Sequence, residues 1–146
     1  MATSVIVSAK TEYACVAMLE LAVRHAAGEP VRIRDIADQH GIPSRFLVQI
    51  LLQLKTAGLV TSLRGASGGY QLAKEPTEIT LGDVMAVVDS QWGRVSGGTL
   101  EDSPTNRVLH SVWQQLATKE QEVLSSVTLA EMAQRLQTQE KGMYYI

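Results

Sequence analysis

The side chains with the clearest chemical capability lie on one face of the segment 44–57. At helical spacing, Leu47, Ile50 and Leu54 fall on one side of this segment and are predicted to be buried. The opposite side carries Ser44, Arg45, Val48, Gln49 and Gln53. Arginine can donate two hydrogen bonds to guanine, and glutamine can donate to and accept from adenine. This face is therefore a candidate for reading bases in the major groove of DNA.

A glycine-rich segment with a basic residue at its start follows this face. Arg64 begins the segment, and its glycines allow tight turns and close approach to another backbone. These glycines are Gly65, Gly68 and Gly69. A basic hairpin can follow the DNA backbone or enter the minor groove, where the negative potential attracts arginine. Lys55 and Lys74 are predicted to contact phosphates, which would position the protein without reading sequence.

The elements that must position these residues are two helices joined by a tight turn, and two short strands. A helix is predicted over 33–40, with Ile36 and Ala37 inward, and another over 44–57 after a Gly-Ile-Pro turn. Alternating apolar and polar residues predict strands at 60–63 and 70–72. This order is typical of a winged helix-turn-helix, whose second helix enters the major groove.

The remaining segments are predicted to be helical. A helix over 8–27 carries an apolar stripe formed by Tyr13, Val16, Leu19, Val23 and Ala26. Capping boxes at Thr80-x-x-Asp83 and Thr128-x-x-Glu131 predict two further helix starts. Between these two starts, a loop over 90–103 leads into a long helix from Pro104 to about Ser125. The apolar stripe of this long helix consists of Leu109, Val112, Trp113, Leu116, Val123 and Val127.

Composition and charge restrict the classes of function. The single cysteine excludes an internal disulfide and a zinc finger within one chain. Since no apolar run is long enough to cross a bilayer and no secretory signal is recognisable, we expect a cytoplasmic protein with no membrane partner. Residues 31–74 contain six basic and two acidic residues and therefore have a net charge of +4. Residues 77–146 contain five basic and nine acidic residues and have a net charge of −4. Such asymmetry fits a basic contact surface on an acidic body.

The sequence resembles the Rrf2 family of bacterial winged-helix transcription regulators. The resemblance covers about residues 8–136, and its most specific part is the Arg-Gly-x-x-Gly-Gly-Tyr segment that begins at Arg64. It implies a mainly α fold with a small β-hairpin: a winged DNA-binding domain over 1–76 and a helical linker and dimerisation region over 77–146. It also implies a homodimer held together by the stripe of the long helix, and base contacts by Gln49 and Arg64.

The chain departs from this family at the position of its metal cofactor. Many members hold an iron–sulfur cluster through three cysteines in the loop before the long helix, but residues 90–103 contain no cysteine. We therefore expect no cofactor and no metal. Glu12 is interpreted as a solvated or ion-paired carboxylate and His110 as a surface or interface residue, with a metal role for either as the alternative. Cys15 is interpreted as a small buried apolar residue, with a redox role as the alternative.

Two functional hypotheses follow, and neither is an enzyme. The first is a cluster-free repressor that acts as a homodimer on double-stranded DNA with a pseudo-palindromic sequence, under an unidentified small-molecule or protein effector. The alternative is a protein-interaction module with a vestigial winged domain. An enzyme is not expected, since no Ser/His/Asp or Cys/His order and no phosphate-binding glycine loop stands out.

Overall fold

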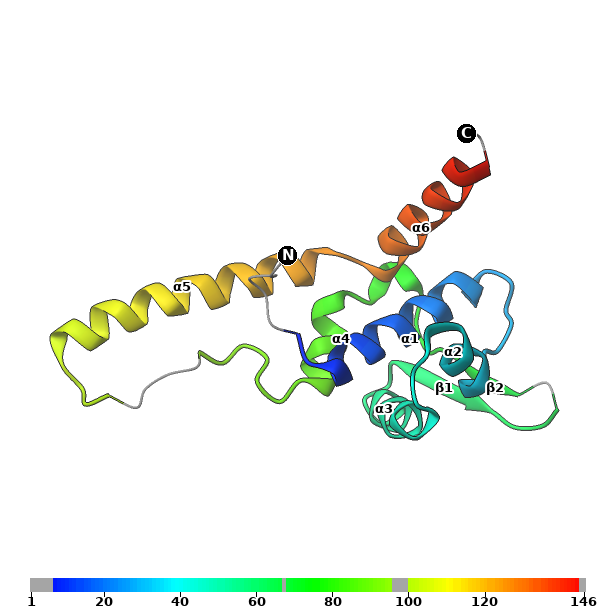
Figure 1. Ribbon diagram of the computed structural model, residues 1–146, viewed down its shortest axis with the longest axis horizontal. Coiled ribbons are helices and arrows are strands. Elements are labelled where there is room, and N and C mark those ends of the chain that lie inside the picture. The colour runs from blue at the N-terminus through cyan, green and yellow to red at the C-terminus, as the bar shows by residue number, and fades with distance from the viewer. Residues whose placement is uncertain (1–6, 67, 96–99, 145–146) are drawn as a thin grey trace.

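The computed structural model describes residues 7–66, 68–95 and 100–144. This part of the chain folds into six α-helices, one short 3₁₀ turn and a two-stranded antiparallel sheet, in the arrangement of Figure 1. The bounds are α1 Ala9–His25, α2 Ile33–His40, α3 Ser44–Thr56, β1 Val60–Leu63, β2 Gly69–Leu72, η1 Pro76–Glu78, α4 Leu81–Val88, α5 Pro104–Ser126 and α6 Leu129–Tyr144. The predicted fold class, mainly helical with a small hairpin, is confirmed.

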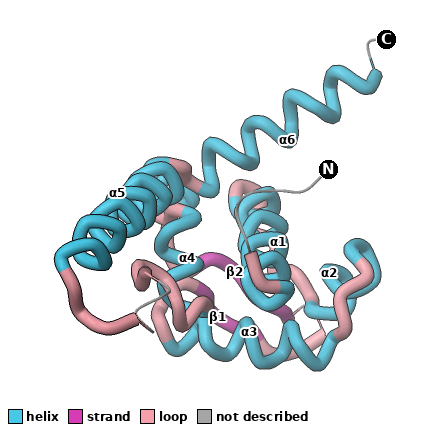
Figure 2. Tube along the Cα trace, turned by 60° about the vertical axis from the view of Figure 1, so that its left-hand side comes forward, coloured by secondary structure: helices cyan, strands magenta, loops and turns pink. Residues whose placement is uncertain are grey.

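Helix α1 forms the centre of the body. Figure 2 shows it surrounded by α4, α2 and α3, and it packs against α3, α4, α6 and β2. The residues of α1 that are fully enclosed are Thr11, Ala14, Ala17, Met18, Leu21 and Ala22. The predicted stripe was therefore misplaced. Tyr13, Val16, Leu19 and Val23 are only half-buried, and Ala26 is exposed, because α1 is apolar on more than one side.

The helix-turn-helix and the hairpin have the predicted boundaries to within one or two residues. Ile36 and Ala37 of α2 are buried, as are the apolar residues of α3, Leu47, Ile50, Leu51 and Leu54. In the hairpin, Val60 pairs with Leu72 and Leu63 with Gly69. A backbone bridge adds Val31 to this sheet, since Val31 N donates to Tyr70 O at 2.9 Å and Tyr70 N donates to Val31 O at 2.8 Å.

The predicted capping box at the start of α4 is confirmed. Thr80 N donates to Asp83 Oδ2 at 2.9 Å, and Asp83 N donates to Thr80 Oγ1 at 3.1 Å. Ile79, Val84 and Leu129 belong to the same hydrophobic core as α1 and α3. The core is thus continuous across the expected domain boundary at residue 76.

Helix α5 is an arm whose C-terminal end is anchored to this body. Leu81 N donates to Val127 O, and Leu129 N donates to Ile79 O, both at 2.9 Å. These bonds fix the chain on either side of the bridge between Thr80 and Thr128. They also correct the predicted stripe of the long helix, because Val127 lies just beyond the end of α5 and is half-buried against its own chain.

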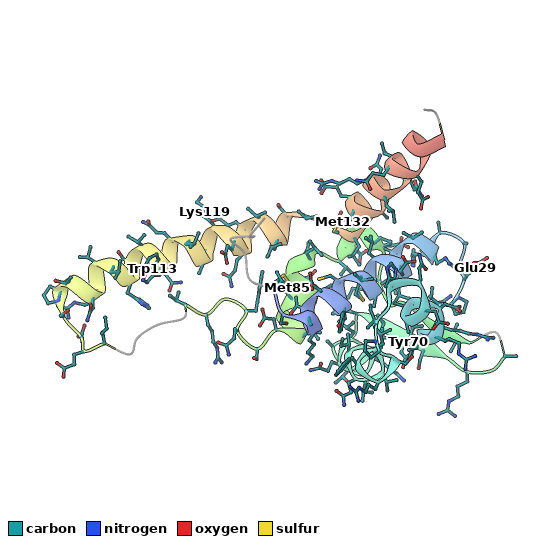
Figure 3. All side chains as sticks on the ribbon, viewed as in Figure 1. Glu29, Tyr70, Met85, Trp113, Lys119 and Met132 are labelled. Carbon is teal, nitrogen blue, oxygen red and sulfur yellow. The ribbon has the colours of Figure 1, made fainter. Side chains whose placement is uncertain are left out.

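The remainder of α5 extends away from the body (Figure 1). The helix has 23 residues, none of them buried, and is about 35 Å long. Figure 3 shows its side chains, Trp113 and Lys119 among them, projecting from a helix that no other described helix or strand accompanies along most of its length. The loop after α4 does approach it, since Arg94 and Val95 line one small pocket together with Trp113 and Leu116. Among the described residues, no helix is long and apolar enough to cross a membrane.

Substituting Gly82 should destabilise the junction between α4 and the arm. A Cβ atom at Gly82 would lie 2.5 Å from Ser125 Oγ and 3.2 Å from Ser125 Cα. We expect Gly82→Val to lower the free energy of unfolding by about 1–3 kcal/mol, because the larger side chain overpacks this contact. Denaturant unfolding at fixed protein concentration measures the change. The control is Ala86→Val on the exposed side of α4, and an equal loss in both variants would contradict this account.

Candidate nucleic-acid interface

The predicted recognition face is the solvent-exposed side of α3. Ser44 is the first residue of this helix, and Arg45, Gln49 and Gln53 follow on its exposed surface. Leu47, Ile50, Leu51 and Leu54, which attach the opposite side of α3 to the core, are at most 1% exposed. Figure 1 places α3 at the lower edge of the body. The structure therefore exposes these polar side chains together on one side of a helix whose other side is packed into the core.

The guanidinium group of Arg45 lies over one aromatic ring, which is itself stacked on a second. Its guanidinium carbon lies 4.9 Å from the centroid of the Phe46 ring, which is a cation–π distance. The Phe46 ring is stacked in turn on Tyr13 of α1, with the centroids 6.2 Å apart and the planes at 29°. Neither Phe46 nor Tyr13 was predicted as part of the interface, because an aromatic residue at helical spacing is typical of the core and carries no sign of its partner.

Lys55 connects the recognition helix to the hairpin. Its Nζ donates to Ser62 Oγ of β1 at 2.8 Å. The predicted role of Lys55 was a phosphate contact alone. An ammonium group has three donors, so this bond leaves two for other partners. Lys55 thus connects α3 to β1 through this hydrogen bond and can still contact a phosphate.

Arg64 stands exposed directly after β1, at the start of the hairpin loop. The glycines predicted as part of the DNA site are required by the backbone geometry of the hairpin. Gly65 has a φ of +104°, and Gly68 N donates to its carbonyl oxygen at 3.0 Å. Gly69 has a φ of +149°, and a Cβ atom at Gly69 would lie 2.6 Å from Val31 O. These glycines shape the loop that carries Arg64 and bring β2 against Val31.

The electrostatics of this surface favour an anionic partner. Arg45, Lys55 and Arg64 are all exposed, and in the described part of the chain none of them forms an ion pair with a carboxylate. Lys74, the other predicted phosphate contact, is also exposed, just after β2. The α3 face and the hairpin together form a basic surface of the kind that binds the DNA backbone and reads its grooves.

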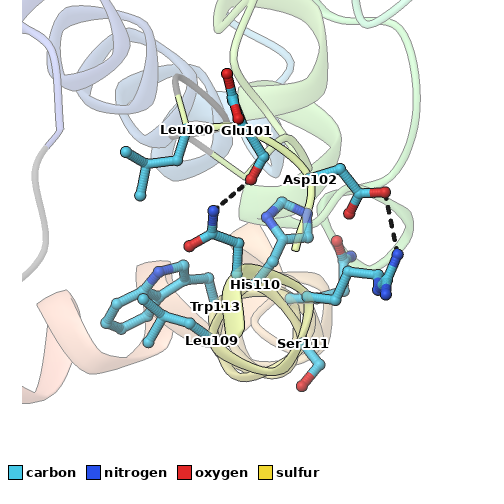
Figure 4. A pocket seen from close by; sticks show the side chains of 10 residues that line it. Leu100, Glu101, Asp102, Leu109, His110, Ser111 and Trp113 are labelled. Carbon is cyan, nitrogen blue, oxygen red and sulfur yellow. Dashed lines mark hydrogen bonds and ion pairs between the residues drawn. The ribbon is translucent and has the colours of Figure 1, made fainter. Parts of the chain in front are cut away.

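A second surface of interest lies on the arm. The predicted dimerisation residues Leu109, Val112, Trp113, Leu116 and Val123 are 46–60% exposed along α5. Near the start of the helix, a cavity of about 530 Å³ is bounded by Leu109, His110 and Trp113 together with Leu100 (Figure 4). Its rim is ordered by Arg107, whose Nη1 lies 3.0 Å from Asp102 Oδ2, and by Asn106, which donates to Glu101 O.

The residues that could hold a metal are separate from one another. Glu12 is exposed on α1 and His110 is exposed on α5, and the described residues contain no group of three His, Cys, Asp or Glu side chains with metal-site geometry. Cys15 is packed against the core. Burial, and to a smaller extent the negative charge of Glu12, raises the pKa of its thiol to about 11. A thiol of this kind is a weak ligand and a weak nucleophile at neutral pH.

Comparisons with known proteins agree on one class. The Rrf2 family, described as an iron-dependent transcriptional regulator, matches residues 7–135. Rv1287 of Mycobacterium tuberculosis (strain H37Rv), inferred to be an HTH-type transcriptional regulator, is 43% identical over 129 residues, which cover 86% of this chain and 80% of that protein. The HTH-type transcriptional regulator CymR of Bacillus subtilis (strain 168) is 38% identical over 142 residues, covering 96% of this chain and 99% of CymR.

Solved structures give the same result. The structure of CymR, the global cysteine regulator of B. subtilis, matches with a TM-score of 0.78 and 34% identity, over 90% of this chain and 98% of that one. T. potens IscR matches with a TM-score of 0.75 and 37% identity, over 97% and 98%. These relatives are regulators rather than enzymes, in agreement with the sequence prediction.

Cys15 should react slowly with alkylating reagents at neutral pH. With a pKa of about 11, only about one thiol in a thousand is ionised at pH 8, and the thiolate is the reactive form. We expect the rate of iodoacetamide labelling to rise about tenfold per pH unit until the pKa is reached. Glu12→Gln should accelerate labelling modestly, because it removes a repelling charge. Labelling of the folded protein at pH 8 as fast as that of the chain in denaturant would refute this prediction.

Proposed function

The chain belongs to the Rrf2 family of transcriptional regulators, and on this premise we propose that it is a homodimeric, sequence-specific DNA-binding repressor that works without an iron–sulfur cluster. The observation that carries this proposal is the joint surface of α3 and the hairpin. It combines an exposed row of Arg and Gln side chains on a rigid helix with an exposed arginine on the adjoining loop. A helix of this kind fits the major groove, and the loop reaches beyond it.

The proposed contacts divide into base readers and backbone contacts. Arg45 and Gln49, in the N-terminal half of α3, are assigned to guanine and adenine. Arg64 is assigned to the minor groove beside the hairpin. Lys55 and Lys74 are assigned to the phosphates, which they would contact without reading sequence. Ser44 and Gln53 lie on the same exposed side of α3 as Arg45 and Gln49 and belong to the proposed DNA-contacting face. The aromatic support of Arg45 favours its assignment as a base reader, since a guanidinium that is already oriented loses less conformational entropy on binding.

The homodimer is proposed from the exposed stripe of α5. Trp113 is 46% exposed and Leu116 is 55% exposed on a helix none of whose residues is fully buried. Such an apolar stripe is unfavourable in water and is typical of an interface between subunits. A two-fold dimer would bring two α3 helices to successive major grooves, so its operator should be a pseudo-palindrome with half-sites about one helical turn apart. Repression is proposed with it, because a dimer bound to an operator that overlaps a promoter would block access to that promoter.

The absence of a cluster is proposed from the donors that the chain offers. The family description is iron-dependent, and clusters of this type are held mainly by thiolates. The chain has one cysteine, its thiol is protonated at neutral pH, and residues 90–103 contain none. The residues therefore do not fit an iron–sulfur cluster. An effector of another kind, a small molecule or a partner protein, could act at the cavity bounded by His110 and Trp113, where the stripe of α5 begins.

Loss of the Gln49 or the Arg64 side chain should weaken operator binding. We expect Gln49→Ala and Arg64→Ala each to cost about 1–3 kcal/mol, which corresponds to roughly a 5- to 150-fold higher Kd. Fluorescence anisotropy with a selected operator measures the effect. Gln134→Ala, on the exposed side of α6, is the matched control and should bind like the wild type. If both interface variants also bind like the wild type, the contact assignment is wrong.

The oligomeric state tests the stripe of α5. At tens of micromolar, the wild type should sediment as a dimer, whereas Leu116→Glu should sediment as a monomer, because a carboxylate cannot be desolvated in an apolar interface without a large penalty. Thr118→Glu places the same charge on the opposite side of α5 and should leave the dimer intact. A wild-type monomer, or a Leu116→Glu variant that remains dimeric, would overturn the proposed interface.

A further inference from the structure

Two large aliphatic side chains are exposed on the recognition face itself. Val48 is 49% exposed and Leu52 is 58% exposed, although both belong to a helix whose buried side is already filled by leucine and isoleucine. With about 3.6 residues per turn, Arg45, Val48, Gln49 and Leu52 occupy one face of α3. The surface that offers hydrogen bonds to DNA therefore also offers apolar area.

The core does not account for these two residues. Single exposed aliphatic residues are common on protein surfaces and need no explanation by themselves. Here, however, the aliphatic pair lies on the same face of α3 as Arg45 and Gln49, and the exposed Lys55 follows Leu52 by about one turn of the same helix. A partner that covers the basic surface covers the aliphatic pair as well, so the occupant of both must be an anion with apolar groups at the base of its groove.

Duplex DNA presents one apolar group of this kind in the major groove, the C5-methyl group of thymine. We infer that Val48 reads a thymine methyl group in each half-site of the operator, an inference that rests on the proposed function. If Gln49 pairs with adenine, the thymine opposite that adenine places its methyl group in the same groove. Val48 adjoins Gln49 in sequence and lies one turn after Ser44, where the N-terminal part of a recognition helix reaches the bases.

Val48 is favoured over Leu52 because of its position along the helix. Leu52 lies one further turn from the N-terminus of α3, and Thr56, whose Oγ1 donates to Leu52 O, follows on the same face near the end of the helix. Side chains near the N-terminus of a recognition helix contact base edges, whereas later turns approach the margin of the groove. Val48 thus contributes an apolar contact to thymine that the hydrogen-bonding side chains of Arg45 and Gln49 do not make.

Deoxyuridine tests this inference, since it differs from thymidine only by lacking the C5-methyl group. Each thymidine of a selected operator is replaced in turn by deoxyuridine, first in one half-site and then at the equivalent position of both half-sites. The Kd of the full-length protein for each operator is measured at a fixed salt concentration. Burial of one methyl group corresponds to about a fourfold change in Kd. We expect one thymine position in each half-site to show this penalty with the wild type and to show none with Val48→Ala.

Two controls separate this inference from the proposed function. Val108→Ala removes the same atoms from a valine that is 69% exposed on α5, and it should keep the deoxyuridine penalty. Gln49→Ala should weaken binding overall while also keeping the penalty. If no deoxyuridine changes the Kd, or if Val48→Ala keeps the penalty, the inference is wrong while the proposed function stands. If no operator is selected, or Gln49→Ala and Arg64→Ala bind like the wild type, the proposed function itself has failed.

Discussion

Close packing around α1 is the constraint on which the rest of the structure depends. Ala14 and Ala17 are fully buried, and such small side chains let α3 and α4 approach the helix closely, while Met18 and Leu21 fill the space between them. Because the buried row of α3 rests on this core, the exposed row is fixed in direction. The same core reaches β2 through Leu72 and the start of α6, just after the arm, through Leu129. One packing arrangement thus orients the recognition helix, the hairpin and the base of α5.

This rigid body contrasts with an arm that has no such support. The bonds from Leu81 and Leu129 hold only the C-terminal end of α5 and the turn after it. Along the arm, apolar side chains remain in solvent, so association with a second chain would supply what intramolecular packing does not. Helix α4 contacts both α5 and α3, so it links the arm to the proposed DNA-binding surface.

Local periodicity was sufficient to predict the helix-turn-helix and the polar face of α3, because α2 and α3 each bury one row of apolar residues. The alternation of apolar and polar residues was likewise sufficient to predict the hairpin. The buried side of α1 could not be predicted in the same way, since its apolar residues surround most of the helix and only tertiary packing selects among them. Contacts between residues that are distant in sequence could likewise not be predicted from local patterns. The bond from Lys55 to Ser62 and the stacking of Tyr13 on Phe46 depend on how α3 meets β1 and α1. Val127 was assigned to the stripe because its spacing fits, although its backbone is extended and its carbonyl oxygen accepts a hydrogen bond from Leu81 N.

The proposed function is tested most directly by selecting genomic fragments of the source organism with purified protein that a chelator keeps free of iron. Affinity for the selected fragments is then measured at two salt concentrations. We expect enrichment of a pseudo-palindrome with half-sites about one helical turn apart, bound with an affinity that falls steeply as salt rises. Selection of no motif by the iron-free protein, together with recovery of one after loading with iron and sulfide, would contradict a cluster-free regulator.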